Sequence, residues 1–148
     1  MAVISKASAT WTGDLANGSG MLTYVTSGAF ARLPVSWGRR TGPNDGRTTP
    51  EEFLASAHAT CFSMAFASRL AKNGSPATRL DVSATVSFEQ GEGGWSVASS
   101  ALDVRGVVTG IDAATFAHLA DDAKENCPIS RTLKGNVALF VEATLVEG

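Results

Sequence analysis

The chain has 148 residues, of which 44% are hydrophobic and 18% are charged, and its formal net charge at pH 7 is -2. This length and composition indicate one folded domain over residues 1–148 rather than a disordered chain. The slightly acidic balance and the lack of a dense Lys/Arg cluster argue against nucleic acid as a partner.

The N-terminal segment Met1–Ser8 has no long apolar run, so no signal peptide is predicted. Apolar stretches elsewhere are interrupted well before the roughly 18 residues that a membrane span requires. We therefore expect a cytoplasmic protein with no membrane partner. In that compartment two cysteines are more often reactive, metal-binding or inert than joined in a permanent disulfide.

The first 47 residues contain strand patterns followed by a polar loop. β-branched and aromatic residues predict strands at 2–11 and 21–27, and a third, short strand at 35–37. Residues 38–47 are polar and rich in glycine, which predicts a loop. Long ordered loops in compact domains often carry functional residues.

A long helix is predicted after this loop. Thr49 suits the N-cap, Pro50 suits the first helical position, and Glu52 completes a Thr-x-x-Glu capping box. The apolar pattern then continues to Asn73-Gly74, a typical helix end. Cys61 lies in the middle of this helix, which is apolar on more than one face, so we expect the helix to be central and largely buried.

The second half of the chain predicts a hairpin, a helix and a final strand. Residues 81–88 alternate in polarity, 92–94 form a turn, and 95–108 supply the returning strand. Asp112 is expected to cap a helix that ends at Cys127-Pro128. A helical turn at 129–133 and a strand at 137–146 complete the pattern. Two helices among antiparallel hairpins indicate an α+β fold.

Cys61 and Cys127 are the only cysteines and the first candidates for chemistry. A cysteine is nucleophilic only as a thiolate, so a neighbouring group must lower its pKa. For Cys61 we expect an arginine of the preceding loop, most plausibly Arg40. For Cys127 we expect the backbone amides of the turn that begins at Pro128. Spacing alone leaves open that both are inert, buried side chains.

Other catalytic and metal-binding patterns are weak. His58 and His118 are the only histidines, and the chain has no CxxC or HExxH motif. It also lacks the GxSxG motif of serine hydrolases. No metal or organic cofactor is therefore predicted.

Two longer blocks of sequence carry a resemblance. Residues 48–65, TTPEEFLASAHATCFSMA, closely resemble the helix of the osmotically inducible protein C (OsmC) family, a relative of the organic hydroperoxide resistance (Ohr) proteins. Residues 123–133, AKENCPISRTL, look like the second-cysteine motif of that family. The segments 11–14 and 110–116 also fit, and the pattern His-Ala-x-Cys-Phe-Ser-Met is similar to the OsmC branch.

The resemblance implies a thiol-dependent peroxidase that reduces organic hydroperoxides and, more weakly, hydrogen peroxide. It implies antiparallel sheets with two central helices in an intertwined homodimer. Cys61 falls on the peroxide-attacking position, Cys127 on the resolving position that forms a disulfide with it, and Glu51 on the family's glutamate. The family's arginine matches Arg40 or Arg39, of which we favour Arg40. A dithiol or lipoyl-type reductant would recycle the protein, without metal, haem or flavin.

Glu51 and Cys61 are ten residues apart on one predicted helix, a separation of about 15 Å. Either Arg40 bridges part of this gap, or Glu51 and the loop reach the partner subunit's Cys61. Phe30, Trp37, Phe53 and Met64 are candidates for an apolar mouth that favours bulky peroxides.

Two further interpretations remain open. In the first, the protein is a redox sensor or a ligand-binding homologue that keeps the fold without turnover. In the second, it is a structural dimer with inert thiols. A sensor would consume peroxide only stoichiometrically, and inert thiols would alkylate slowly.

Overall fold

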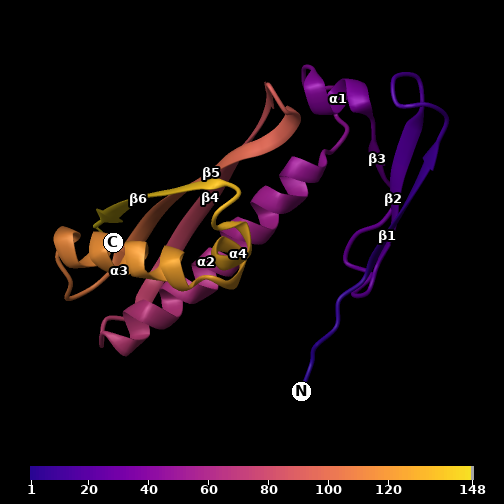
Figure 1. Cartoon of the computed structure of the whole chain (residues 1–148). Coiled ribbons are helices and arrows are strands. Elements are labelled where there is room, and N and C mark those ends of the chain that lie inside the picture. The colour runs from indigo at the N-terminus through magenta and orange to yellow at the C-terminus, as the bar shows by residue number, and fades with distance from the viewer. Residues whose placement is uncertain (148) are drawn as a thin grey trace. The chain divides into compact units, whose positions relative to one another are not determined.

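A computed structural model describes residues 1–147 of the chain (Figure 1). These residues form two compact units, one of residues 1–52 and one from Phe53 onward. The long helix α2 (Pro50–Lys72) begins in the first unit and continues through the second. The sequence predicted a single domain over residues 1–148, and the division into two compact units does not test that prediction.

The first unit contains a three-stranded antiparallel sheet. Its strands are β1 (Ala7–Thr12), β2 (Ser19–Val25) and β3 (Leu33–Val35), in the order β1-β2-β3. The turn between β1 and β2 closes where the Asp14 carboxylate accepts a hydrogen bond from the Asn17 backbone N–H at 2.8 Å. All three strands were predicted from the sequence, but β1 begins five residues later than the predicted strand, and β3 ends before Trp37.

The segment predicted as a loop begins with a short helix, α1 (Trp37–Thr41), so the prediction was wrong for these residues. Ser36 caps this helix, because its hydroxyl accepts a hydrogen bond from the Arg39 backbone N–H at 3.1 Å. Arg39 and Arg40 therefore lie on the last turn of a helix, which sets the direction in which each side chain leaves the backbone.

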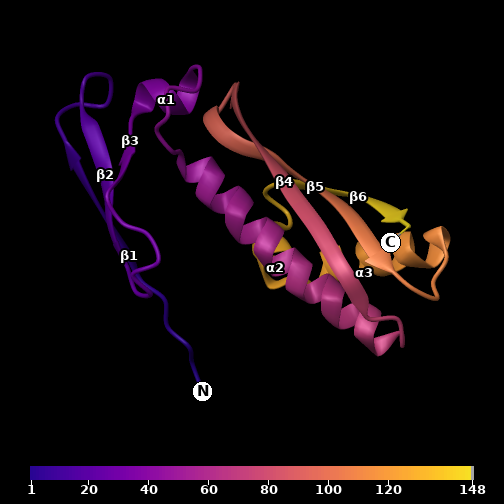
Figure 2. The ribbon, with the colours of Figure 1, turned by 180° about the vertical axis from the view of Figure 1, so that it is seen from behind.

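The second unit contains a mixed sheet in the order β4-β5-β6 (Figures 1 and 2). β4 (Ala77–Gly91) and β5 (Gly94–Val108) form the predicted antiparallel hairpin, with Gly91 paired to Gly94 across the turn. β6 (Ala138–Val146) runs parallel to β5, unlike the antiparallel pairing expected throughout. Two helices fill the connection between β5 and β6, which gives the chain the length that a parallel crossover requires.

The helices of the second unit follow the predicted boundaries. In α2, Thr49 Oγ accepts a hydrogen bond from the Glu52 N–H at 3.1 Å, and the chain leaves the helix at Gly74, whose φ is +80°. Asp112 caps α3 (Ala113–Asn126) by accepting from the Thr115 N–H at 2.7 Å. Cys127 alone then separates α3 from α4 (Pro128–Leu133), which begins at Pro128.

α2 and α3 pack on the same face of the β4-β5-β6 sheet and enclose the core. Phe66 of α2 and Phe116 of α3 lie with ring centroids 4.9 Å apart. Gly106 of β5 permits this arrangement, because a Cβ there would lie 2.5 Å from a ring carbon of Phe116. The remaining core side chains come from α2, β5, α3 and the α3–α4 junction: Phe62, Leu70, Leu102, Val104, Val108, Ala120, Ala123 and Cys127.

Candidate active site

The second unit brings Cys61 and Cys127 together, although they are far apart in the sequence. Cys61 lies on α2 and packs against the core cluster to which Cys127 belongs. The Cys127 side chain lies close enough to Cys61 to raise the pKa of its thiol, and both are free thiols. Cys127 is fully buried, whereas Cys61 is partly accessible. Accessibility therefore makes Cys61 the cysteine that a solute can reach.

Burial raises the pKa of the Cys61 thiol above its ordinary value, and the adjacent Cys127 raises it further. The backbone N–H of Ile129 opposes this shift by donating a hydrogen bond to the Cys61 sulfur. We expected the amides after Pro128 to face Cys127, but this amide faces Cys61. The first turn of α4 thus places its donor on the more accessible sulfur.

A buried histidine lies one helical turn from Cys61. His58 is completely buried, and both of its ring nitrogens have partners. Nδ1 lies 2.6 Å from the hydroxyl of Ser100 on β5, and Nε2 lies 2.8 Å from the hydroxyl of Ser130 on α4. Burial lowers the pKa of His58, which favours the neutral ring. The sequence shows His58 as one of only two histidines but gives no sign of its contacts with Ser100 and Ser130.

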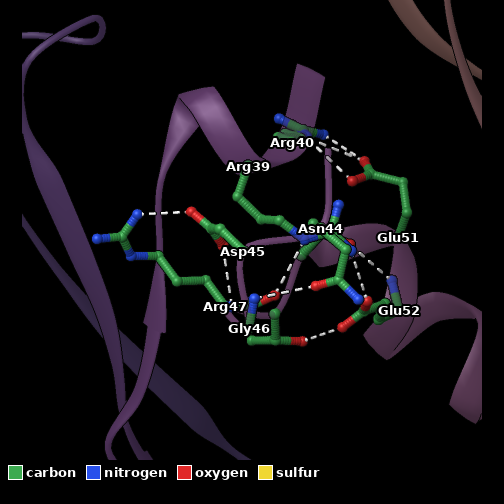
Figure 3. A network of polar contacts seen from close by, with 10 residues as sticks. Arg39, Arg40, Asn44, Asp45, Gly46, Arg47, Glu51 and Glu52 are labelled. Atoms are coloured by element: carbon green, nitrogen blue, oxygen red, sulfur yellow. Dashed lines mark hydrogen bonds and ion pairs between the residues drawn. The ribbon is translucent and has the colours of Figure 1, made fainter. Parts of the chain in front are cut away.

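The first unit contains a cluster of arginines and carboxylates, shown in Figure 3. Arg40 donates two hydrogen bonds from Nε and one from Nη2 to the Glu51 carboxylate, at 3.0, 3.2 and 2.7 Å. Arg39 instead pairs with Glu52 at 2.9 Å and donates to the Arg47 carbonyl oxygen at 3.1 Å. Glu51 is only 8% exposed. Of the two arginines that the sequence left open, Arg40 is the one that contacts Glu51.

A hollow of about 240 Å³ in the first unit lies beside the Arg40 side chain. Its lining is mainly apolar: Trp11, Leu15, Val35, Trp37 and Pro50, with Ser36 and Arg40 as the polar members. Of the four residues predicted for an apolar mouth, Trp37 is in this lining. Phe30 lines a separate hollow, and Phe53 and Met64 belong to the second unit. The hollow therefore combines a fixed guanidinium with apolar surface.

Residues 1–147 contain no group of three or more His, Cys, Asp or Glu side chains placed to hold a metal ion. Within the same residues, no helix is both long enough and apolar enough to cross a membrane. His118, the second histidine, is exposed on α3. The second unit thus holds the two thiols of Cys61 and Cys127, and the first unit holds the guanidinium of Arg40 paired with Glu51.

Comparisons with known proteins agree on one family. The OsmC-like protein family matches residues 42–142. Peroxiredoxin OsmC of Escherichia coli K12 is 36% identical over 139 residues, which cover 94% of this chain and 96% of the relative. The same protein from Shigella flexneri matches with the same identity and coverage.

Solved structures share the fold at lower identity. The organic hydroperoxide resistance protein OhrB of Bacillus subtilis superposes with a TM-score of 0.72 at 24% identity, over 94% of this chain and 98% of that one. An OsmC-like protein of Mycoplasma pneumoniae superposes with a TM-score of 0.74 at 17% identity, over 99% and 100%. With these matches over nearly its whole length, this chain belongs to the OsmC-like protein family.

Proposed function

We propose that this protein is a cysteine-based peroxidase that reduces organic hydroperoxides and, more weakly, hydrogen peroxide. The observation that carries the proposal is the proximity of a partly accessible Cys61 to a buried Cys127. A relative 36% identical to this chain is named a peroxiredoxin, which supports the same chemistry here. A structural neighbour named for organic hydroperoxide resistance supports the substrate class.

In the proposed reaction, the Cys61 thiolate attacks the distal oxygen of the hydroperoxide. A sulfur–oxygen bond forms, the peroxide bond breaks, and the alkoxide takes a proton to leave as an alcohol. Cys61 has then lost two electrons and is a sulfenic acid. The Cys127 sulfur next attacks the Cys61 sulfur, water leaves, and a disulfide forms. An external dithiol reopens this disulfide by thiol exchange.

Arg40 is proposed to stabilise the charges that this reaction creates. Burial raises the pKa of Cys61, so the thiolate needs a positive partner beyond the single amide of Ile129. The Arg40 guanidinium is always charged, and Glu51 fixes its orientation through three hydrogen bonds. A guanidinium held in this way can stabilise a thiolate and the developing negative charge of the leaving oxygen.

The preference for organic hydroperoxides is proposed from the apolar hollow beside Arg40. Each methylene group buried from water contributes about 0.8 kcal/mol. A substrate with an alkyl or aryl group would therefore bind better than hydrogen peroxide. Trp11, Leu15 and Trp37 supply apolar surface next to the polar head group that Arg40 can bind.

The proposal includes a homodimer and a dithiol or lipoyl-type reductant, and it uses no metal, haem or flavin. In this reaction the hydroperoxide is the oxidant and the dithiol is the reductant. Each of these assignments can be tested with the purified protein.

The test is steady-state consumption of cumene hydroperoxide with a dithiol, for the wild type and for Cys61→Ser. We expect many turnovers per wild-type subunit and none for the variant. A wild type that reacts once and stops, with Cys61 reduced and alkylatable at the start, would overturn the enzyme proposal. That result would favour a redox sensor.

A further inference from the structure

We propose that His58 is a positioning residue that holds α4, through Ser130, so that the Ile129 N–H stays on the Cys61 sulfur. This inference deepens the proposed function. It rests on that function in one respect, because it takes Cys61 as the nucleophile. The geometry that carries it is the link between α2 and α4 from His58 Nε2 to the Ser130 hydroxyl, at 2.8 Å. Beside it, a second link joins Cys61 to the backbone amide of Ile129, which lowers the pKa of the thiol.

The two links are neighbours on both helices. His58 and Cys61 are three residues apart on α2 and therefore share one face of that helix. Ile129 and Ser130 are consecutive residues in the first turn of α4. A displacement of α4 that breaks the hydrogen bond between His58 and Ser130 would therefore also displace the Ile129 N–H from Cys61.

The buried ring is suited to this role because it has a fixed set of partners. A neutral imidazole has one donor nitrogen and one acceptor nitrogen, and a serine hydroxyl can satisfy either. The bonds to Ser100 and Ser130 therefore use both nitrogens of the completely buried ring. An unpartnered polar group at such a site would be costly, so the ring resists moving away from either serine.

Three segments meet at His58, and each has a separate part. Ser100 lies on β5 and ties the ring to the sheet, whereas Ser130 lies on α4 and ties it to the helix that carries the Ile129 amide. α4 has only six residues and begins directly after Cys127, so it has little other helical structure to hold it in place. The link to Ser130 should therefore affect Cys61, and the link to Ser100 should not.

This difference gives a matched pair of variants. Ser130→Ala and Ser100→Ala each remove one hydroxyl partner from the same buried ring, so both should lower the melting temperature to a similar extent. The measurement is the rate of Cys61 alkylation by iodoacetamide against pH, in a Cys127→Ser background so that one thiol reports.

We expect Ser130→Ala to slow alkylation at pH 7 by about three- to tenfold and to move the midpoint of the pH profile to higher pH. Both effects follow from weakening one hydrogen bond to a charged sulfur. Ser100→Ala should stay within about twofold of the background rate. Equal slowing by both variants, or no slowing by Ser130→Ala, would overturn the proposal and leave His58 as a packing residue.

Substitutions of the ring provide a second test. His58→Gln places an amide where Nε2 lies and can still reach Ser130, whereas His58→Asn places one where Nδ1 lies and can reach only Ser100. We expect His58→Gln to keep most of the Cys61 reactivity and His58→Asn to lose it. The opposite order would contradict the proposal. Alkylation needs no peroxide, so these results stand even if the wild type fails to turn over.

Discussion

The polar cluster of the first unit and the thiol site of the second differ in how far apart their residues lie in the sequence. Arg40 and Glu51 are 11 residues apart and meet across one short connection between two helices. His58 and Ser130 are 72 residues apart and meet only because α2, the sheet and α4 pack together. The first cluster can form from local structure, whereas the second requires the whole second unit.

The two regions also differ in their electrostatics. The first holds fixed charges in pairs, with Arg40 on Glu51 and Arg39 on Glu52. In the second, partial burial disfavours a thiolate at Cys61. The proposed function assigns a division of labour to them, in which the first region supplies positive charge and the second supplies the reactive sulfur of Cys61.

The largest expected effect comes from removing Cys127, the proposed resolving cysteine. Cys127→Ser should stop disulfide formation, so that the sulfenic acid formed at Cys61 persists until dimedone or further peroxide reacts with it, and turnover with a dithiol falls sharply. Mass spectrometry after dimedone treatment should find the label on Cys61. A Cys127→Ser protein that keeps wild-type turnover would contradict the assignment.

The next largest effect is expected at Arg40. Arg40→Met should lower kcat/KM for cumene hydroperoxide by about 100-fold, the usual loss when a donor to a developing oxyanion is removed. Arg39→Met is the matched control, because it breaks the neighbouring ion pair with Glu52 at 2.9 Å and should leave kcat/KM within about twofold. Equal losses in both variants would mean that the cluster acts on stability alone.

A third change tests the packing on which the thiol site depends. Gly106→Ala would place a Cβ 2.5 Å from a ring carbon of Phe116, so α3 or the sheet must move. We expect a loss of about 1–3 kcal/mol in the free energy of unfolding, measured by urea denaturation. Gly93→Ala, in the hairpin turn with no atom within 4 Å of the new Cβ, is the control and should change stability little.

Much of the fold could be predicted because its signals are local. Thr49, Pro50 and Gly74 fixed the ends of α2, and Asp112 fixed the start of α3, since caps and stops depend on neighbouring residues. α1 was missed because it is a five-residue helix with Gly38 inside it, a pattern that favours a loop.

The details of the site were less predictable because they depend on tertiary packing. Arg39 and Arg40 are adjacent in sequence, and only the helical geometry of α1 directs one to Glu52 and the other to Glu51. No sequence signal links Ile129 to Cys61. The family resemblance implies a disulfide between Cys61 and Cys127, and the structure places these two side chains near each other. The amides after Pro128 were expected to act on Cys127, whereas the Ile129 amide acts on Cys61.

The smallest expected effect is that of Arg40→Met on the pH profile of Cys61 alkylation. This measurement tests whether the two regions act on each other. The thiolate is the reactive form, so the rate rises with pH through the pKa of Cys61. If Arg40 supplies positive charge to this sulfur, Arg40→Met leaves burial as the dominant influence, which raises the pKa. The variant should then alkylate a few-fold more slowly at pH 7 than the wild type and reach its plateau at higher pH. Identical profiles in the two proteins would show that the charge of the first unit does not act on the thiol of the second, and the proposed division of labour would fail.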